Sequence, residues 1–223
     1  MSAFTAKLAP LGLILWAFGG GTAFAGACDG SESPSVVVSS PPQPVVIDRS
    51  RGISELTNMM GPNESLANSG FLTLGITSVD YNTSVKSSVQ IKKSRFSDWC
   101  AYPLSIVVTH AFSKPITVYI AKELPEGSCK YQKTLEHEMK HVKYHQDGLL
   151  RASVEIDRAL STAARESFPI SGGSSEEVSK VVSDKVSEIV SATVRDVSAS
   201  VKASNDAMDT PDAYRAFSAL CRE

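Results

Sequence analysis

The strongest constraint on the fold is a pair of long amphipathic segments in the C-terminal half of the chain. Between Cys129 and about Phe168, apolar residues recur every three or four positions, which is the spacing of one helix face. Pro169 and the glycines that follow it end this segment, and a second apolar stripe runs over residues 174–204. The second stripe consists of Val178, Val182, Val186, Ile189, Val190, Val194, Val197 and Val201. We expect two helices packed as an antiparallel hairpin, with self-association through the valine stripe as the alternative.

Local signals bear on where these helices begin and end. Ser128 follows the Pro125–Gly127 break and can cap the first helix by accepting a main-chain hydrogen bond. Gly148 is the weak point inside that helix, and it marks a bend or an early end. A short last helix is expected after Pro211, ending near Cys221.

Residues 70–122 have the patterns of β-strands. Apolar residues alternate with polar ones around Val85–Ile91, and less regularly over Phe71–Val79. The clearest pair of strands is Leu104–Thr109 and Ile116–Ile120, joined by a Ser-Lys-Pro turn. This pair predicts a β-hairpin.

The order of these segments predicts an α+β fold. We expect a small antiparallel sheet packed on the long first helix, with the second helix completing a C-terminal helical hairpin. The predicted units are an α+β domain over residues 45–168 and a C-terminal helical segment over residues 174–223 that packs on it.

The first 25 residues have the pattern of a signal peptide. Lys7 precedes the apolar run Leu8–Phe18, and Ala23-Phe24-Ala25 places small residues where signal peptidase cleaves. The apolar run is too short for a comfortable membrane span. We expect residues 26–44, rich in Ser and Pro, to be a flexible linker, and the mature protein to be exported to the periplasm or the extracellular space.

The four cysteines, Cys28, Cys100, Cys129 and Cys221, suit disulfide bonds in an exported protein. Cys100 and Cys129 flank the expected β-hairpin and could close it, which would leave Cys28 to pair with Cys221. Alternatively, Cys28 follows Ala25-Gly26-Ala27 as the cysteine of a lipid-attachment site would. Lipidation would anchor the protein to a membrane and leave Cys221 a free thiol.

The charge of the chain argues against one class of partner. With 22 basic and 24 acidic residues, the net charge is −2, which gives no basic field for nucleic acid. The sequence also contains no Gly-rich phosphate loop. We therefore expect no nucleic-acid partner.

One cluster carries recognisable chemistry, the run His137-Glu138-Met139-Lys140-His141 within the first long helix. Helical residues four apart differ by about 40° in azimuth and about 6 Å in height, so His137 and His141 can bind one ion. Zinc prefers such nitrogen ligands and accepts three protein ligands with an open fourth position. Glu138 would flank the ion, where it can take a proton from a zinc-bound water. The cluster therefore predicts Zn²⁺ on His137 and His141, with Glu138 as the catalytic base.

The sequence leaves the third metal ligand open. His145 shares the helix face of the motif, but it lies about 12 Å along the axis from His137. It is a candidate metal ligand only if the helix unwinds before Gly148. The other candidates are Asp147, Glu155, His110, Glu176, Glu177, Asp184 and Glu188.

The motif resembles the active-site helix of zincin-type metallopeptidases. Residues 99–145 are also similar to a group of small, secreted, uncharacterised bacterial proteins regarded as zinc peptidases. The resemblance implies a zincin-like domain, zinc on the two motif histidines and Glu138 as the general base. It further implies that an upstream strand, Ile116–Ile120, binds an extended peptide as an added strand. The sequence departs from the metzincin pattern, because Tyr144 and Asp147 stand where that pattern has Gly and a third His.

These observations lead to two hypotheses about function. The first is a secreted zinc-dependent hydrolase, an endopeptidase that acts on peptide or protein substrates through a water activated by Glu138. The alternative is an exported, non-catalytic binding or structural protein whose metal site is structural or absent. Replacement of Glu138 distinguishes the two, because only the enzyme requires a base at that position.

Overall fold

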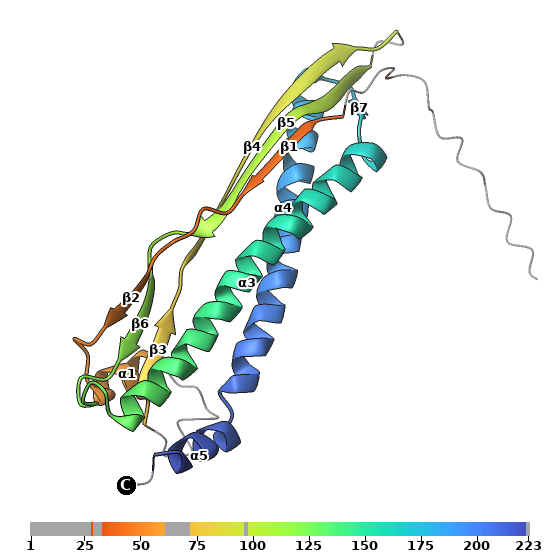
Figure 1. Cartoon of the computed structure of the whole chain (residues 1–223). Coiled ribbons are helices and arrows are strands. Elements are labelled where there is room, and N and C mark those ends of the chain that lie inside the picture. Colours follow the sequence, from red (N-terminus) through yellow and green to blue (C-terminus); the bar gives the residue numbers. More distant parts are fainter. Residues whose placement is uncertain (1–27, 29–32, 61–71, 96–97, 222–223) are drawn as a thin grey trace, which may run out of the picture.

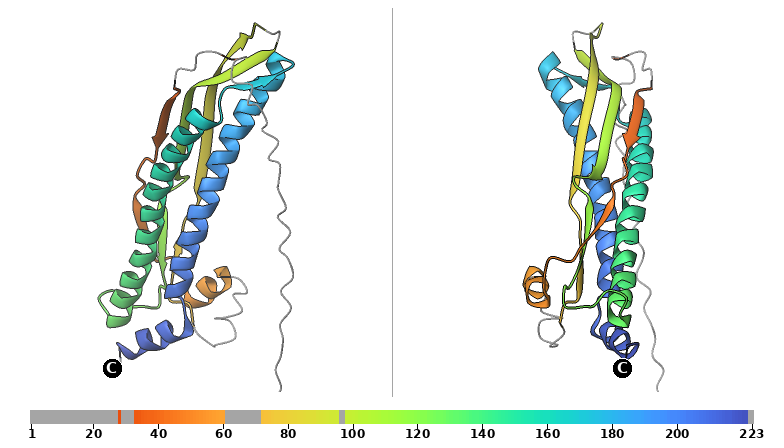
Figure 2. Two further views of the ribbon diagram at one scale, coloured as in Figure 1. Left: turned by 90° about the vertical axis from the view of Figure 1, so that its right-hand side faces the viewer. Right: turned by 60° about the vertical axis from the view of Figure 1, so that its left-hand side comes forward.

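The computed structural model describes residues 28, 33–60, 72–95 and 98–221, so the predicted signal peptide lies outside the described residues. The molecule has two layers: a pair of long helices, and two small sheets that lie end to end along them (Figure 1 and Figure 2). The predicted α+β class, with a long motif-bearing helix and C-terminal helices, is confirmed.

The long helices are α3 (Cys129–Glu166) and α4 (Ser175–Met208), and the shorter α5 (Pro211–Ala219) follows them. As predicted, Ser128 caps α3: its hydroxyl accepts a hydrogen bond of 3.2 Å from the main-chain N–H of Tyr131. The two long helices pack antiparallel, as Figure 2 shows, and Ala152, Val197 and Val201 are buried at their seam. The end of α4 therefore lies beside the beginning of α3.

Gly148 does not end α3, which continues to Glu166. A Cβ atom at Gly148 would collide with Cγ2 of Val201 on α4. The glycine thus lets the two helices approach closely about two turns beyond His141. That close packing, rather than a break in the helix, accounts for a residue of low helix propensity at this position.

The first sheet has the strand order β1–β5–β4, and a short strand β7 also pairs with β5. Its strands are β1 (Ser35–Ser39), β4 (Tyr81–Lys93), β5 (Trp99–Phe112) and β7 (Ile170–Gly172). β4 and β7 run antiparallel to β5, whereas β1 runs parallel to it. The expected linker over residues 26–44 therefore contains a strand. Its valines at 36–38 pair with residues 106–108 of β5, and such sheet pairing favours β-branched residues.

The second sheet has the strand order β2–β6–β3. Its strands are β2 (Val45–Asp48), β3 (Gly75–Ser78) and β6 (Ile116–Ile120), and helix α1 (Ile53–Met59) lies at the same end of the molecule (Figure 1). β2 is parallel to β6 and β3 is antiparallel to it. The predicted β-hairpin is therefore wrong, because β5 and β6 belong to different sheets. Both edges of each strand are already paired with other strands, and residues 113–115 only carry the chain from one sheet to the next.

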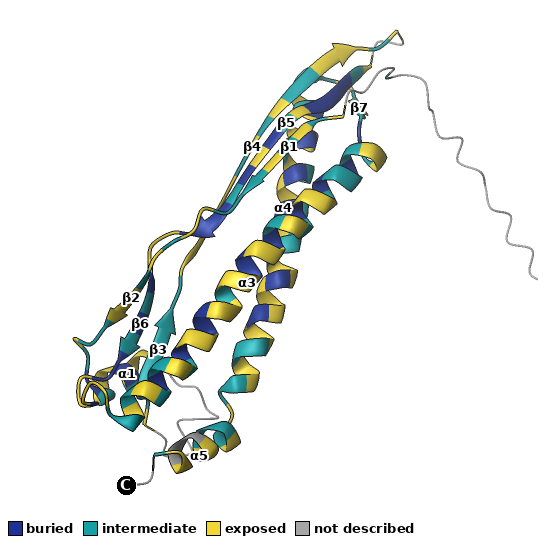
Figure 3. Cartoon of the chain, viewed as in Figure 1, coloured by how far each residue is buried: buried dark blue, intermediate teal, exposed yellow. Residues whose placement is uncertain are grey.

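Each sheet packs on the helices through its own apolar cluster. The valines of α4 pack on Ile106 and Val108 of β5, together with Ile156 and Leu160 of α3. At the other sheet, Leu56 of α1 and the three isoleucine and valine residues of β6 pack on Val142 and Leu149 of α3. These buried positions form the inner faces of the two layers (Figure 3). The second cluster fixes the beginning of α3, which carries the His137–His141 motif.

Two disulfides join Cys28 to Cys100 and Cys129 to Cys221, with Cα–Cα distances of 5.8 Å and 5.7 Å. The expected pairing of Cys100 with Cys129 is therefore wrong. Without a β5–β6 hairpin, the start of β5 and the start of α3 lie at opposite ends of the molecule (Figure 1). Because Cys28 is bonded to Cys100, it has no thiol left for a lipid. Both bonds suit an exported protein in an oxidising compartment.

Within the part of the chain that the structure describes, none of the helices is both long enough and apolar enough to span a bilayer.

Candidate metal centre

Two of the predicted ligands lie beside a carboxylate that was not among the predicted candidates. His137 and His141 project from α3 toward Asp209, which caps the C-terminal end of α4. Oδ1 of Asp209 lies 3.0 Å from Nε2 of His137 and 3.2 Å from Nε2 of His141, and the two Nε2 atoms are 3.1 Å apart. One ligand atom from each residue lies within 4.8 Å of the others, so this group could hold a metal ion.

The antiparallel helix pair explains why Asp209 reaches the motif. The chain leaves α4 at Asp209, whose main-chain N–H bonds back to the carbonyl groups of Asn205 and Asp206. The chain then turns into α5, and the disulfide from Cys221 to Cys129 fastens the segment after α5 to the first residue of α3. Asp209 is thus held between two fixed points, one at the end of α4 and one at the start of α3.

The remaining predicted ligands do not join this group. His145 lies one turn further along α3, where its Nδ1 is 2.9 Å from the hydroxyl oxygen of Tyr81. Burial, with a smaller effect from His141, lowers the pKa of His145 to about 4. His110 is 3% exposed, and its Nδ1 lies 2.8 Å from the hydroxyl oxygen of Thr83. Among the described residues, the acidic candidates also lie outside the group: Asp147, Glu155, Glu176, Glu177, Asp184 and Glu188.

Glu138, the predicted base, is 5% exposed and faces strand β3. Oγ1 of Thr77 lies 2.8 Å from Oε2 of Glu138 and 3.1 Å from its main-chain oxygen. A Cβ at Gly75 would lie 2.8 Å from Cγ and from Oε1 of Glu138, so the glycine gives the carboxyl group room beside the strand. Burial raises the pKa of Glu138 above its ordinary value, although His141 and Thr77 oppose this effect.

A tyrosine from α5 completes the surroundings of the candidate metal centre. The hydroxyl of Tyr214 donates to Oδ1 of Asp209 over 3.4 Å, and its ring centroid is 5.9 Å from that of His137. Burial and the negative charge of Asp209 raise the pKa of Tyr214, so its hydroxyl keeps its proton.

Asp209 and His141 stabilise each other's charged forms. Burial disfavours the charge of Asp209, but hydrogen bonds from His137 and His141 outweigh burial and hold the pKa of Asp209 well below its ordinary value. Burial likewise disfavours the charge of His141, yet its hydrogen bonds to Asp209 and Asn205 raise the pKa of His141. The group is therefore an anionic carboxylate between two imidazoles, which is a suitable set of ligands for a divalent cation.

The chain matches no known family of proteins, and neither a curated protein nor a solved structure is similar to it. The zincin resemblance therefore depends on the motif and its surroundings alone.

Proposed function

We propose that this chain is an exported zinc-dependent hydrolase, an endopeptidase, with His137, His141 and Asp209 as metal ligands and Glu138 as the general base. The observation that carries the proposal is the convergence of Asp209 on both histidines of the motif, next to a buried glutamate. Two imidazoles and one carboxylate are a ligand set of catalytic zinc sites, in which the fourth position stays open for water or substrate.

The residues around the metal centre supply the groups that such a hydrolysis needs. Zinc, when bound, would lower the pKa of a coordinated water toward 7 and polarise a carbonyl group. Glu138 accepts the proton, and its raised pKa brings the carboxylate closer to the working pH, where general bases are most effective. Tyr214 keeps its proton and can donate a hydrogen bond to the negative charge that develops on the substrate oxygen.

The sheet beside the site favours an extended peptide as substrate. The peptide would add to strand β3, and not to Ile116–Ile120 as expected from the sequence. Strand β6 pairs with β2 on one side and β3 on the other, so Ile116–Ile120 has no edge to offer. Among the described strands, β3 is an edge strand, and it carries Thr77 against Glu138. An extended peptide that adds to β3 through main-chain hydrogen bonds would pass beside the general base.

The test is the zinc content of the mature chain, residues 26–223, beside a His137→Ala/His141→Ala variant. Wild-type protein is expected to hold close to one zinc per chain and to cleave a fluorescently labelled, unfolded protein. The double variant should lose both properties while keeping its circular dichroism spectrum. If neither protein takes up zinc after loading, the non-catalytic alternative replaces this proposal, and the helical pair becomes the candidate functional surface.

Zinc uptake is expected to weaken in acid. To bind, a zinc ion must displace the proton of His141, whose pKa is raised. Protons therefore compete with zinc for this histidine at a pH where an ordinary histidine is mostly neutral. Affinity should rise with pH up to that pKa and then level off, with a loss of about tenfold per pH unit below it for each displaced proton. Competition with a chromophoric chelator between pH 5 and pH 8 measures this. A constant affinity over that range would contradict the assignment of His141.

A further inference from the structure

Asn205 of α4 lies between two histidines of α3. Its Oδ1 is 2.6 Å from Nδ1 of His141, and its Nδ2 is 3.5 Å from Nε2 of His145. The same Nδ2 donates to the main-chain oxygen of Val201 over 3.1 Å. Asn205 is therefore in contact with a proposed metal ligand on one side and with a residue outside the metal centre on the other.

The Val201 carbonyl group fixes which way the Asn205 amide points. A flipped amide would place Oδ1 against the carbonyl oxygen of Val201, where two acceptors would face each other. With the amide in its observed orientation, Oδ1 can only accept, so Nδ1 of His141 must carry a proton. A neutral His141 then has its lone pair on Nε2, the atom that faces His137 and Asp209.

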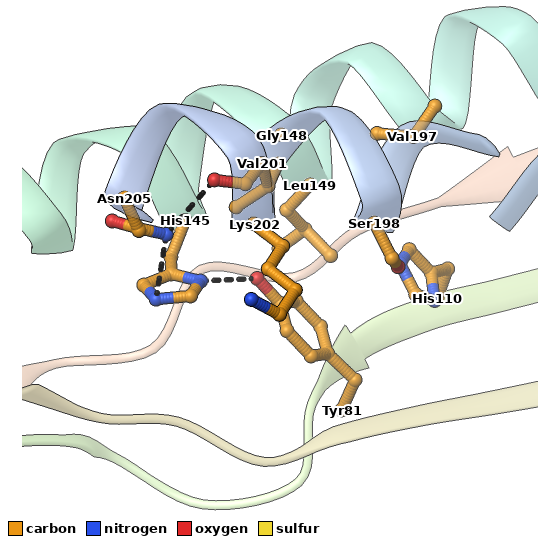
Figure 4. Close-up of a pocket in the computed structure, with 10 residues that line it drawn as sticks. All are labelled: Tyr81, His110, His145, Gly148, Leu149, Val197, Ser198, Val201, Lys202 and Asn205. Carbon is orange, nitrogen blue, oxygen red and sulfur yellow. Dashed lines mark hydrogen bonds between the residues drawn. The ribbon is translucent and has the colours of Figure 1, made fainter. Parts of the chain in front are cut away.

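His145 supports the other side of the amide. Because Asn205 donates to Nε2 of His145, the neutral ring carries its proton on Nδ1 and donates to the hydroxyl oxygen of Tyr81 over 2.9 Å. Figure 4 shows this chain of contacts from α4 through His145 to Tyr81 at the start of β4. The chain borders a cavity of about 170 Å³, which is also lined by Gly148 and Lys202. Asn205 thus bonds to α4 through Val201 and to α3 through His141 and His145, and His145 connects it to the sheet through Tyr81.

We propose that Asn205 is a positioning residue for the metal centre: it holds His141 in the tautomer and ring orientation that present Nε2 to the metal, and His145 and Tyr81 brace it. This inference rests on the proposed zinc site. Hydrogen bonds from outside the ligand set orient metal-binding histidines, and their removal typically costs 10–100-fold in metal affinity. The role also explains why His145 belongs to the histidine cluster of the motif helix without being a ligand.

Two substitutions separate this role from a general effect on stability. Asn205→Leu removes the acceptor for His141, whereas Asn205→Asp keeps that acceptor and loses the bonds that the amide nitrogen makes with Val201 and His145. Both variants should melt at a lower temperature than wild type, because both lose the bond to Val201. Only Asn205→Leu is expected to bind zinc 10–100-fold more weakly. Lys202→Ala is the matched control, because it lines the same cavity and pairs with Asp206 without contacting His141.

A second readout needs no metal. In metal-free protein with ¹⁵N-labelled histidine, the Nδ1 proton of His141 should be protected from exchange and visible by NMR in wild type and Asn205→Asp, and lost in Asn205→Leu. Equal zinc affinities in the two variants, or an unchanged affinity in Asn205→Leu, would overturn the positioning role. Wild-type protein that shows the protected proton but takes up no zinc would overturn the metal centre, and with it the role of Asn205, while confirming the hydrogen bond.

Discussion

Replacement of Glu138 by Gln is expected to abolish hydrolysis and leave the zinc in place. The amide keeps the size of the side chain and still accepts a hydrogen bond from Thr77, but it cannot take a proton from water. General-base catalysis typically contributes 10²–10⁴-fold, so the cleavage rate should fall by about that factor. Initial rates on a labelled unfolded protein and the zinc content per chain measure the two effects on the same sample.

Glu136→Gln is the matched control for this substitution. Glu136 lies on the same helix, is exposed, and pairs with Lys133 at the surface, so its replacement should change neither the rate nor the zinc content. A Glu138→Gln variant that cleaves at the wild-type rate would show that Glu138 is not the base. Loss of the metal in that variant would instead point to Glu138 as a ligand.

Replacement of Asp209 by Asn is expected to weaken zinc binding by more than 100-fold. The substitution removes the one anionic member of the group, and a direct ligand should matter more than the 10–100-fold typical of groups that only orient ligands. Hydrolysis at limiting zinc should be lost with the metal, and excess zinc should restore part of it. Competition with a chelator gives the affinity, and titration of the activity with zinc gives the rescue.

Asp206→Asn serves as the control for Asp209→Asn. Asp206 lies less than one helical turn before Asp209, but its carboxylate pairs with Lys202 at the surface. Its loss should leave zinc affinity close to that of wild type. If Asp209→Asn binds zinc normally and His145→Gln does not, the third ligand is His145, and helix α3 must unwind before Gly148 when the metal binds.

The long helices and their ends could be predicted from sequence because the signals are local. Apolar spacing located α3 and α4, and Ser128 and Pro211 indicated where helices begin. The motif itself is local too, since His137 and His141 share a helix face by spacing alone. Local signals were misleading at residues 113–115, where a turn pattern predicted a β-hairpin. There, each strand had other partners far away in the sequence.

The approach of Asp209 to the two histidines could not be found by local spacing, because it depends on how two helices pack. Asp209 is 68 residues from His141, and its own surroundings in the sequence are those of an ordinary helix end. The useful signal was the similar length of the two helical segments. An antiparallel pair of similar length brings the end of the second helix to the start of the first, so acidic residues near residue 209 were better candidates than those near residue 176. The acidic residues of α4 named as candidates, Glu176, Glu177, Asp184 and Glu188, all lie before the last five turns of that helix, away from Asp209.

The disulfide between Cys129 and Cys221 closes the same end of the helix pair as the proposed zinc ligands. If zinc binding and formation of this disulfide favour the same arrangement of the chain, each must strengthen the other by the same factor. Zinc in the site would make this disulfide harder to reduce, and reduction would loosen the hold on zinc to the same extent. In a reducing environment the chain would release metal more readily, so oxidising conditions would themselves favour the zinc-loaded form.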